Sequence, residues 1–193
     1  MRKITITLLV IGGCFVVPQR PAAQTRDVDV ERSVVTVHVF KSGLFSAFAD
    51  NHEIRAPITR GSVNESEPSV EIAIDARNLR VIDADLPADK RAEVQQRMLG
   101  PDVLDSAQFP EIRFRSTTVR PVGSGRWRVE GTLTLHGESH PAAVDVTGGN
   151  GRYHGSATIR QRDFGITPIS IVGGTVKVKN EVRLEFDVLL SRD

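Results

Sequence analysis

Residues 111–148 read EIRFRSTTVR, PVGSG, RWRVEGTLTLH, GESHP and AAVDVTG in succession, and this stretch decides the fold. The first, third and fifth segments are rich in β-branched and aromatic residues, which is typical of strands. The second and fourth carry the Gly, Pro and Ser of tight turns. Strands joined by such short turns pair antiparallel, so the stretch predicts consecutive β-hairpins.

The same alternation of strand and turn segments continues on both sides of this stretch. Val34 to Phe40 places Val35, Val37 and Val39 on one face of a strand. Similar runs bounded by Gly, Pro, Asn and Asp predict further strands at about 51–58, 61–64, 69–75, 152–162 and 175–190. Eight or so antiparallel strands joined in this way predict an all-β barrel or sandwich.

One segment departs from the strand pattern. Residues Pro87 to Leu99 are strong helix formers with a narrow apolar stripe that includes Val94 and Met98, four positions apart. Gly100 and Pro101 then end the helix. We expect a short helix that forms a lid in a loop over one end of the β structure.

The first residues have the order of a secretion signal. Arg2 and Lys3 precede an apolar run that ends at Val17, which is too short for the roughly 20 residues of a membrane span. Residues 1–23 are therefore expected to be a signal, removed after Ala23, and residues 24–193 to form one β domain in the periplasm or outside the cell. The alternative is a membrane-anchored lipoprotein, because Ile11-Gly12-Gly13-Cys14 resembles a lipobox.

The composition of the chain argues against several classes of function. Cys14 is the single cysteine, so a chain cut after Ala23 has no disulfide and no thiolate chemistry. Losing Arg2, Lys3 and Arg20 leaves 22 basic and 24 acidic residues, a net charge of −2, and we expect no nucleic-acid partner. No serine lies in a G-x-S-x-G motif, and we expect no catalytic residue, no cofactor and no metal.

The alternative function is a metal-binding or enzymatic envelope protein that uses its histidines, His52 above all. His136 and His140 are four apart, but they flank a Gly-containing segment followed by Pro141, which favours a hairpin turn over a zinc-binding helix. His52 begins a strand beside an apolar segment, where it would contact a ligand headgroup or pair with His38 around a metal. A structural role for His52 is the simpler interpretation.

The chain is short of side chains that could fill a barrel. Aromatic residues make up 5% of it, and eight-stranded barrels are either filled by side chains or hold one small ligand. This shortage predicts an internal apolar cavity. A barrel whose interior is fully packed, as in a purely structural envelope protein, is the alternative.

Three segments resemble the successive motifs of the YceI-like family, in the same order and at similar spacing. They are Phe109-Pro110-Glu111-Ile112-Arg113-Phe114-Arg115-Ser116, Gly131 to Gly137 continuing through His140-Pro141, and Arg162-Asp163-Phe164-Gly165-Ile166. The resemblance runs from about Val28 to Leu190. It implies a lipocalin-like, antiparallel eight-stranded barrel that is exported in bacteria and encloses a long isoprenoid or fatty-amide-like chain.

On this basis we expect a lipid-binding or carrier protein and not an enzyme. The candidate cavity-lining residues are Phe45, Phe48, Ile112, Phe114, Leu133, Leu135, Phe164 and Ile166, with His52 as a headgroup contact. Two segments depart from the family pattern, Gly43 to His52 and Asp83 to Gly100, so the ligand or its headgroup can differ from an isoprenoid. The sequence leaves the oligomeric state open, a homodimer included.

Overall fold

The computed structural model describes residues 25–42, 51–171 and 176–192, and this part of the chain is almost entirely β structure with one α-helix. The strands are β1 (Thr25–Asp27), β2 (Val34–Ser42), β3 (His52–Ala56), β4 (Ile58–Asn64), β5 (Ser69–Asp75), β6 (Arg80–Val81), β7 (Glu111–Gly123), β8 (Arg126–Leu135), β9 (Glu138–Gly149), β10 (Arg152–Arg160), β11 (Ser170–Ile171) and β12 (Val176–Leu189). The helix α1 spans Ala88–Leu99. None of the described helices has the length and apolarity that a membrane crossing requires.

All strands belong to one curled antiparallel sheet. Its order is β1-β4-β5-β7-β8-β9-β10-β12-β2-β3-β6, with β11 paired to β12 beside this path. The hairpins predicted from residues 111–162 are present, since β7, β8, β9 and β10 follow one another as neighbours. His136 and Gly137, with φ of 53° and 79°, make a two-residue turn between β8 and β9. A two-residue hairpin turn of this kind needs two residues with positive φ. Because His136 and Gly137 form the turn, β9 begins at Glu138, and Pro141 lies inside this strand.

The predicted number of eight strands was wrong, since the described residues contain twelve. The excess comes from β1, β6 and β11, which are too short to show a strand pattern in the sequence. The strands predicted at 51–58 and 61–64 are present as β3, which pairs with β2, and β4, which pairs with β5. The boundary between them lies at Pro57, which cannot donate a ladder hydrogen bond, so β4 begins earlier than predicted.

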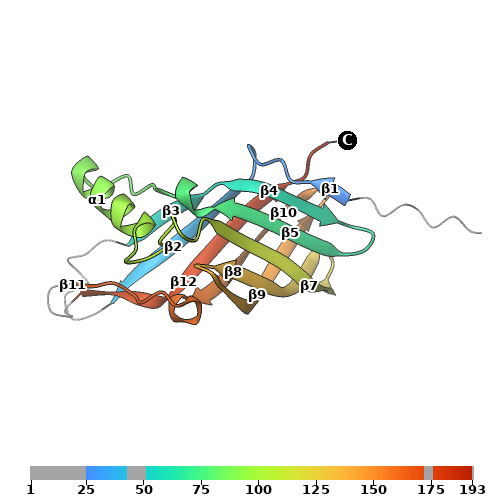
Figure 1. Ribbon diagram of the computed structural model, residues 1–193. Coiled ribbons are helices and arrows are strands. Elements are labelled where there is room, and N and C mark those ends of the chain that lie inside the picture. Colours follow the sequence, from blue (N-terminus) through green and yellow to red (C-terminus); the bar gives the residue numbers. More distant parts are fainter. Residues whose placement is uncertain (1–24, 43–50, 172–175, 193) are drawn as a thin grey trace, which may run out of the picture.

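The barrel has two distinct ends (Figure 1). At one, here called the α1 end, α1 lies over the sheet and the β8–β9 turn is found. At the other, the β1 end, β1 pairs with the last residues of β4, and Val28 bridges to Leu190 near the C-terminus.

The predicted helix over 87–99 is confirmed to within one residue, with Pro87 preceding its first turn. Its apolar stripe faces the barrel, because Met98 is buried in the main core cluster and Val94 and Leu99 pack against that cluster. Gln95 attaches the helix to β6: its side-chain amide accepts a hydrogen bond from the Val81 N–H and donates one to the Leu79 carbonyl, both at 2.8 Å.

Candidate functional site

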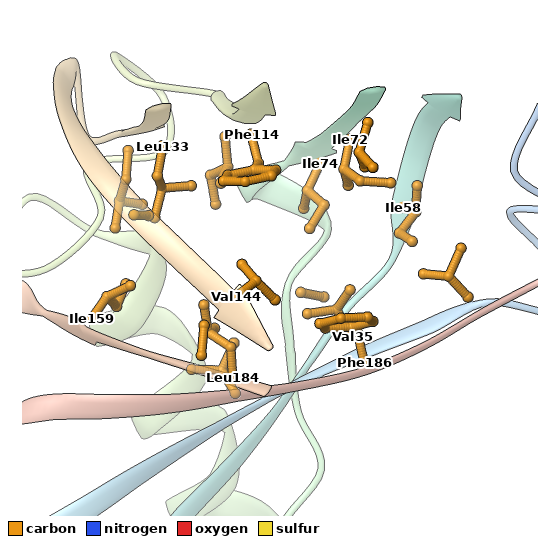
Figure 2. Close-up of a pocket in the computed structure, with 18 of the residues that line it drawn as sticks. Val35, Ile58, Ile72, Ile74, Phe114, Leu133, Val144, Ile159, Leu184 and Phe186 are labelled. Atoms are coloured by element: carbon orange, nitrogen blue, oxygen red, sulfur yellow. The ribbon is translucent and has the colours of Figure 1, made fainter. Parts of the chain in front are cut away.

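The interior of the barrel holds an apolar cavity of about 350 Å³. Its wall is built from β2, β3, β4, β5, β7, β8, β9, β10 and β12, and it is almost entirely aliphatic and aromatic carbon. Figure 2 shows side chains from opposite walls pointing into this shared space, among them Ile72 and Phe114 on one side and Leu184 and Phe186 on the other.

Strand alternation explains why these residues face inward. Val35, Val37 and Val39 on β2 lie opposite Ala56, Ile54 and His52 on β3, so one phase of both strands faces the interior. The cavity is lined by the three valines, Ile54 and Ala56. Every residue of β2 stays partly exposed, which for the inward valines means that they border open space rather than other side chains.

Two glycines keep the large rings against the wall. A Cβ on Gly131 of β8 would lie 2.7 Å from the Phe114 ring, and one on Gly155 of β10 would lie 2.7 Å from the Phe186 ring. Each aromatic ring therefore occupies the place of a missing side chain on a neighbouring strand. In this way both phenylalanines contribute apolar surface without filling the centre of the barrel.

The few polar lining residues gather mainly at the β1 end. Asn64, Glu65 and Ser69 lie in or beside the β4–β5 turn, and Tyr153 is in β10. At the α1 end the lining includes Met98, and its polar group is the Gln161 amide, which already donates a hydrogen bond to the Lys179 carbonyl at 2.8 Å. Among the described residues, the cavity is thus apolar along its length and polar at one mouth.

Three side chains at this mouth, Arg26, Glu65 and Tyr153, form a connected group that we call the polar mouth. Tyr153 Oη donates a hydrogen bond to Glu65 Oε1, and Arg26 Nη1 lies 3.5 Å from Glu65 Oε2. Arg26 Nη2 also donates to the Ser191 carbonyl at 2.9 Å. Burial, with the hydrogen bond to Glu65 as the second cause, raises the pKa of Tyr153 to about 12, so its hydroxyl remains a donor at neutral pH.

Most of the predicted lining residues that are described do border the cavity. These are Ile112, Phe114, Leu133, Leu135 and Ile166. Phe164 does not: it is buried in the main core cluster and packs edge to face on His140, with ring centroids 5.2 Å apart. It is the last residue of a short 3₁₀ turn, Gln161–Phe164, which places it against His136 and His140 of the β8–β9 hairpin. Phe45 and Phe48 lie outside the described residues.

His52 is engaged in a structural pair. Its Nδ1 lies 2.6 Å from Asp83 Oδ2, and the other Asp83 oxygen accepts the Glu53 N–H at 2.6 Å. His52 is not among the residues that line the cavity. His38 pairs across the ladder with Glu53, whereas His52 lies opposite Val39, so the two histidines are on opposite faces of the sheet and do not meet.

His136 and His140 both contact Phe164. His136 Nδ1 is within hydrogen-bond distance of the Phe164 carbonyl, at 3.1 Å, and its ring packs on Phe109 at 4.7 Å. The hairpin-turn interpretation of His136 is confirmed by the β8–β9 turn. Among the described residues, no group of three or more His, Cys, Asp or Glu side chains is arranged to hold a metal ion.

Sequence reasoning missed the contribution of the last strand and the polar mouth. Val182, Leu184, Phe186 and Val188 all line the cavity, and their spacing of two was a signal that could have identified them. Glu65 and Tyr153 gave no such signal, since they are 88 positions apart in the chain.

Fold and cavity together define a small antiparallel β-barrel that has an apolar interior and one polar mouth. The model of the YceI-like domain matches residues 27–190, and the chain belongs to this family. It is 25% identical over 178 residues to a UPF0312 protein of Shewanella, covering 86% of this chain and 88% of that one. A UPF0312 protein of Pseudomonas savastanoi is 35% identical over 85 residues, 39% of this chain and 44% of the relative, so this match spans less than half of the relative's length.

Solved structures show the same fold. BcnA of Burkholderia cenocepacia superposes with a TM-score of 0.62 at 19% identity, over 85% of this chain and 99% of that one. A mutant YceI protein of Campylobacter jejuni, crystallised with a monobromobimane guest, gives a TM-score of 0.50 at 13% identity over the whole of both chains. At these identities the likeness establishes the architecture.

Proposed function

We propose that this protein binds one long apolar molecule, an isoprenoid- or fatty-amide-like chain, inside its barrel and acts as a carrier rather than an enzyme. The observation that carries the proposal is the unfilled apolar cavity of about 350 Å³. Ligand pockets commonly enclose about 300–1,000 Å³. No large side chain among the described residues is fully buried, and the inward valines of β2 stay partly exposed, so part of the barrel interior is unfilled.

The energetics favour an alkyl or prenyl chain as the occupant. Each CH₂ moved from water into an apolar interior contributes about 0.8 kcal/mol. The wall offers aliphatic and aromatic carbon from nine strands, whereas its polar atoms lie at the ends. A long tail therefore gains free energy along the whole barrel without any specific polar contact.

The chemistry of the lining supports binding over catalysis. Glu65 and Tyr153 are the titratable side chains among the described lining residues, and they are hydrogen-bonded to each other at one mouth. General acid–base catalysis needs such groups beside a reacting atom, whereas the walls of this cavity present carbon.

Export is the second part of the proposal. We propose that residues 1–23 direct the chain out of the cytoplasm, with lipidation at Cys14 as the alternative route to the envelope. The charged start, short apolar run and small residues near Ala23 support this.

Organic extraction and mass spectrometry of natively purified protein test the binding proposal. We expect an apolar long-chain molecule to be recovered with the wild-type protein. Ala157→Phe is the matched variant, because Ala157 lines the cavity and pairs with Leu184 across the ladder. A phenyl ring there occupies the space of the ligand, and we expect the recovered amount to fall about tenfold or more, which corresponds to a loss of about 1.4 kcal/mol.

Thr158→Phe is the control for this variant. Thr158 is the next residue on β10, is exposed and points outward, so the same ring at that position leaves the cavity open. The proposal fails if wild-type protein yields no apolar molecule and takes up no hexadecanol when it is offered. It also fails if Ala157→Phe and Thr158→Phe retain ligand equally.

A further inference from the structure

The polar mouth joins the paired strands β1 and β4 to β10, which is not a neighbour of either in the sheet. Glu65 follows β4, Tyr153 is in β10, and Arg26 is in β1, which pairs with β4. Glu65 and Tyr153 also line the cavity. A molecule that fills the barrel with its tail would therefore place its end group against these two side chains.

Packing fixes the orientation of the group. The Tyr153 ring stands edge to face on Trp127, with centroids 5.7 Å apart and planes at 71°, and Trp127 lines the cavity as well. Arg26 lies over Gly151, where an added Cβ would be 3.0 Å from its guanidinium. Because Gly151 has no side chain, Arg26 can reach the mouth. The Arg26 side chain is only 20% exposed there.

The charges of the group indicate which end group it accepts. Glu65 lines the cavity, whereas Arg26, which is paired with Glu65 and with the Ser191 carbonyl, does not. A carboxylate or phosphate end group would meet the negative charge of Glu65 first. An alcohol can donate its proton to Glu65 and accept the Tyr153 hydroxyl proton, which replaces the existing hydrogen bond without placing an unpaired charge.

We propose that the polar mouth is the headgroup site of the barrel and that it selects an uncharged hydroxyl headgroup over an anionic one, with the tail directed toward the α1 end. This inference rests on the proposed function, since it assigns the orientation and the headgroup of the same ligand. It moves the headgroup contact away from His52, which is paired with Asp83.

The orientation is measured through Trp127, the single tryptophan of the chain. Bromine quenches indole fluorescence at short range, so two hexadecanols are compared, one brominated next to the hydroxyl and one at the far end of the chain. We expect the first to quench Trp127 strongly and the second weakly. Equal quenching, or stronger quenching by the second, overturns the orientation.

Headgroup selection is measured by competition among hexadecanol, hexadecanoate and hexadecyl phosphate on the purified full-length protein. We expect wild type to bind the alcohol about tenfold more tightly than either anion, the scale of one hydrogen bond lost at a partly buried site. Glu65→Gln removes the negative charge and leaves the positive charge of Arg26 without the Glu65 carboxylate, so we expect the anions to gain about tenfold relative to the alcohol. Tyr153→Phe should weaken alcohol binding about fivefold to tenfold.

Glu67→Gln is the matched control, because Glu67 is exposed in the same turn and does not line the cavity. It should leave the order of affinities as in wild type. If the three chains bind wild type equally, or if Glu65→Gln and Glu67→Gln behave alike, the headgroup site is wrong while the barrel remains a binding site. If none of the chains binds the wild-type protein, the proposed function itself fails and the headgroup inference fails with it.

Discussion

Tyr153 joins the wall of the cavity to its polar mouth. Its ring packs on Trp127, and its hydroxyl donates to Glu65. Burial and the contact with a carboxylate both disfavour the phenolate, which is why the pKa of Tyr153 rises from 10 to about 12. The side chain is thus held in its neutral, proton-donating form.

The stability of the protein should therefore fall in strong alkali. The folded-state pKa is raised above the unfolded value, so the contribution of Tyr153 is complete below about pH 10 and is lost as the pH rises to about 12. Since Tyr153 is the single tyrosine, absorbance of the phenolate measures its titration directly. A midpoint near pH 10 in the folded protein would contradict the described contacts.

A matched variant separates this effect from general alkaline unfolding. Tyr153→Phe keeps the ring on Trp127 and removes the titrating group. Its free energy of unfolding should decline less steeply between pH 10 and 12 than that of wild type, as measured by urea denaturation.

Among the secondary-structure elements, α1 is stabilised more by its contacts with the barrel than by its own sequence. Its apolar stripe is narrow, and Met98 is the buried residue within it. The Gln95 side chain supplies the polar attachment, since it pairs with the backbone of β6 and of the residue before it. These two hydrogen bonds supplement the few backbone hydrogen bonds that β6, which is only two residues long, can make with β3.

Replacing Gln95 with Leu tests this attachment. The Val81 N–H and the Leu79 carbonyl would lose their partners in a partly buried position, so we expect the free energy of unfolding to drop by about 1–2 kcal/mol. Gln96→Leu makes the same change at the neighbouring exposed position and should stay within about 0.5 kcal/mol of wild type. Chemical denaturation measures both, and equal losses would show that Gln95 does not anchor the helix.

At the scale of the whole molecule, the barrel has chemically different ends. The lining at the α1 end is apolar apart from the Gln161 amide, and α1 lies over the sheet at that end (Figure 1), whereas the β1 end carries the polar mouth. Under the proposed function, this arrangement would keep the tail of an amphiphile enclosed while its headgroup remains near water.

Export is a prediction about the whole chain. Produced in a bacterium with residues 1–23 in place, the protein should be recovered outside the cytoplasm with Gln24 as its first residue, as measured by cell fractionation and intact-mass analysis. Cys14→Ser is the control for the lipoprotein route, since it abolishes lipidation but leaves cleavage after Ala23 possible. A cytoplasmic chain that keeps residues 1–23 would contradict the proposal.

The sequence by itself determined the class of fold and the nature of the interior. Alternating valines at 35, 37 and 39, and the turn residues around Gly137, predicted antiparallel hairpins because strand period and turn chemistry are local properties. Local propensity and the following Gly100-Pro101 likewise located α1. The scarcity of large side chains predicted a cavity because the volume available for filling a barrel depends on composition.

Tertiary structure alone decided the number of strands, the place of Phe164 and the polar mouth. The short strands β1, β6 and β11 are defined by their pairing with β4, β3 and β12, and Phe164 lies in the core where His136 and His140 contact it. Arg26, Glu65 and Tyr153 meet only when β1, β4 and β10 are brought to one end of the barrel. Contacts between residues so far apart in the chain follow from the pairing of strands, which no local pattern encodes.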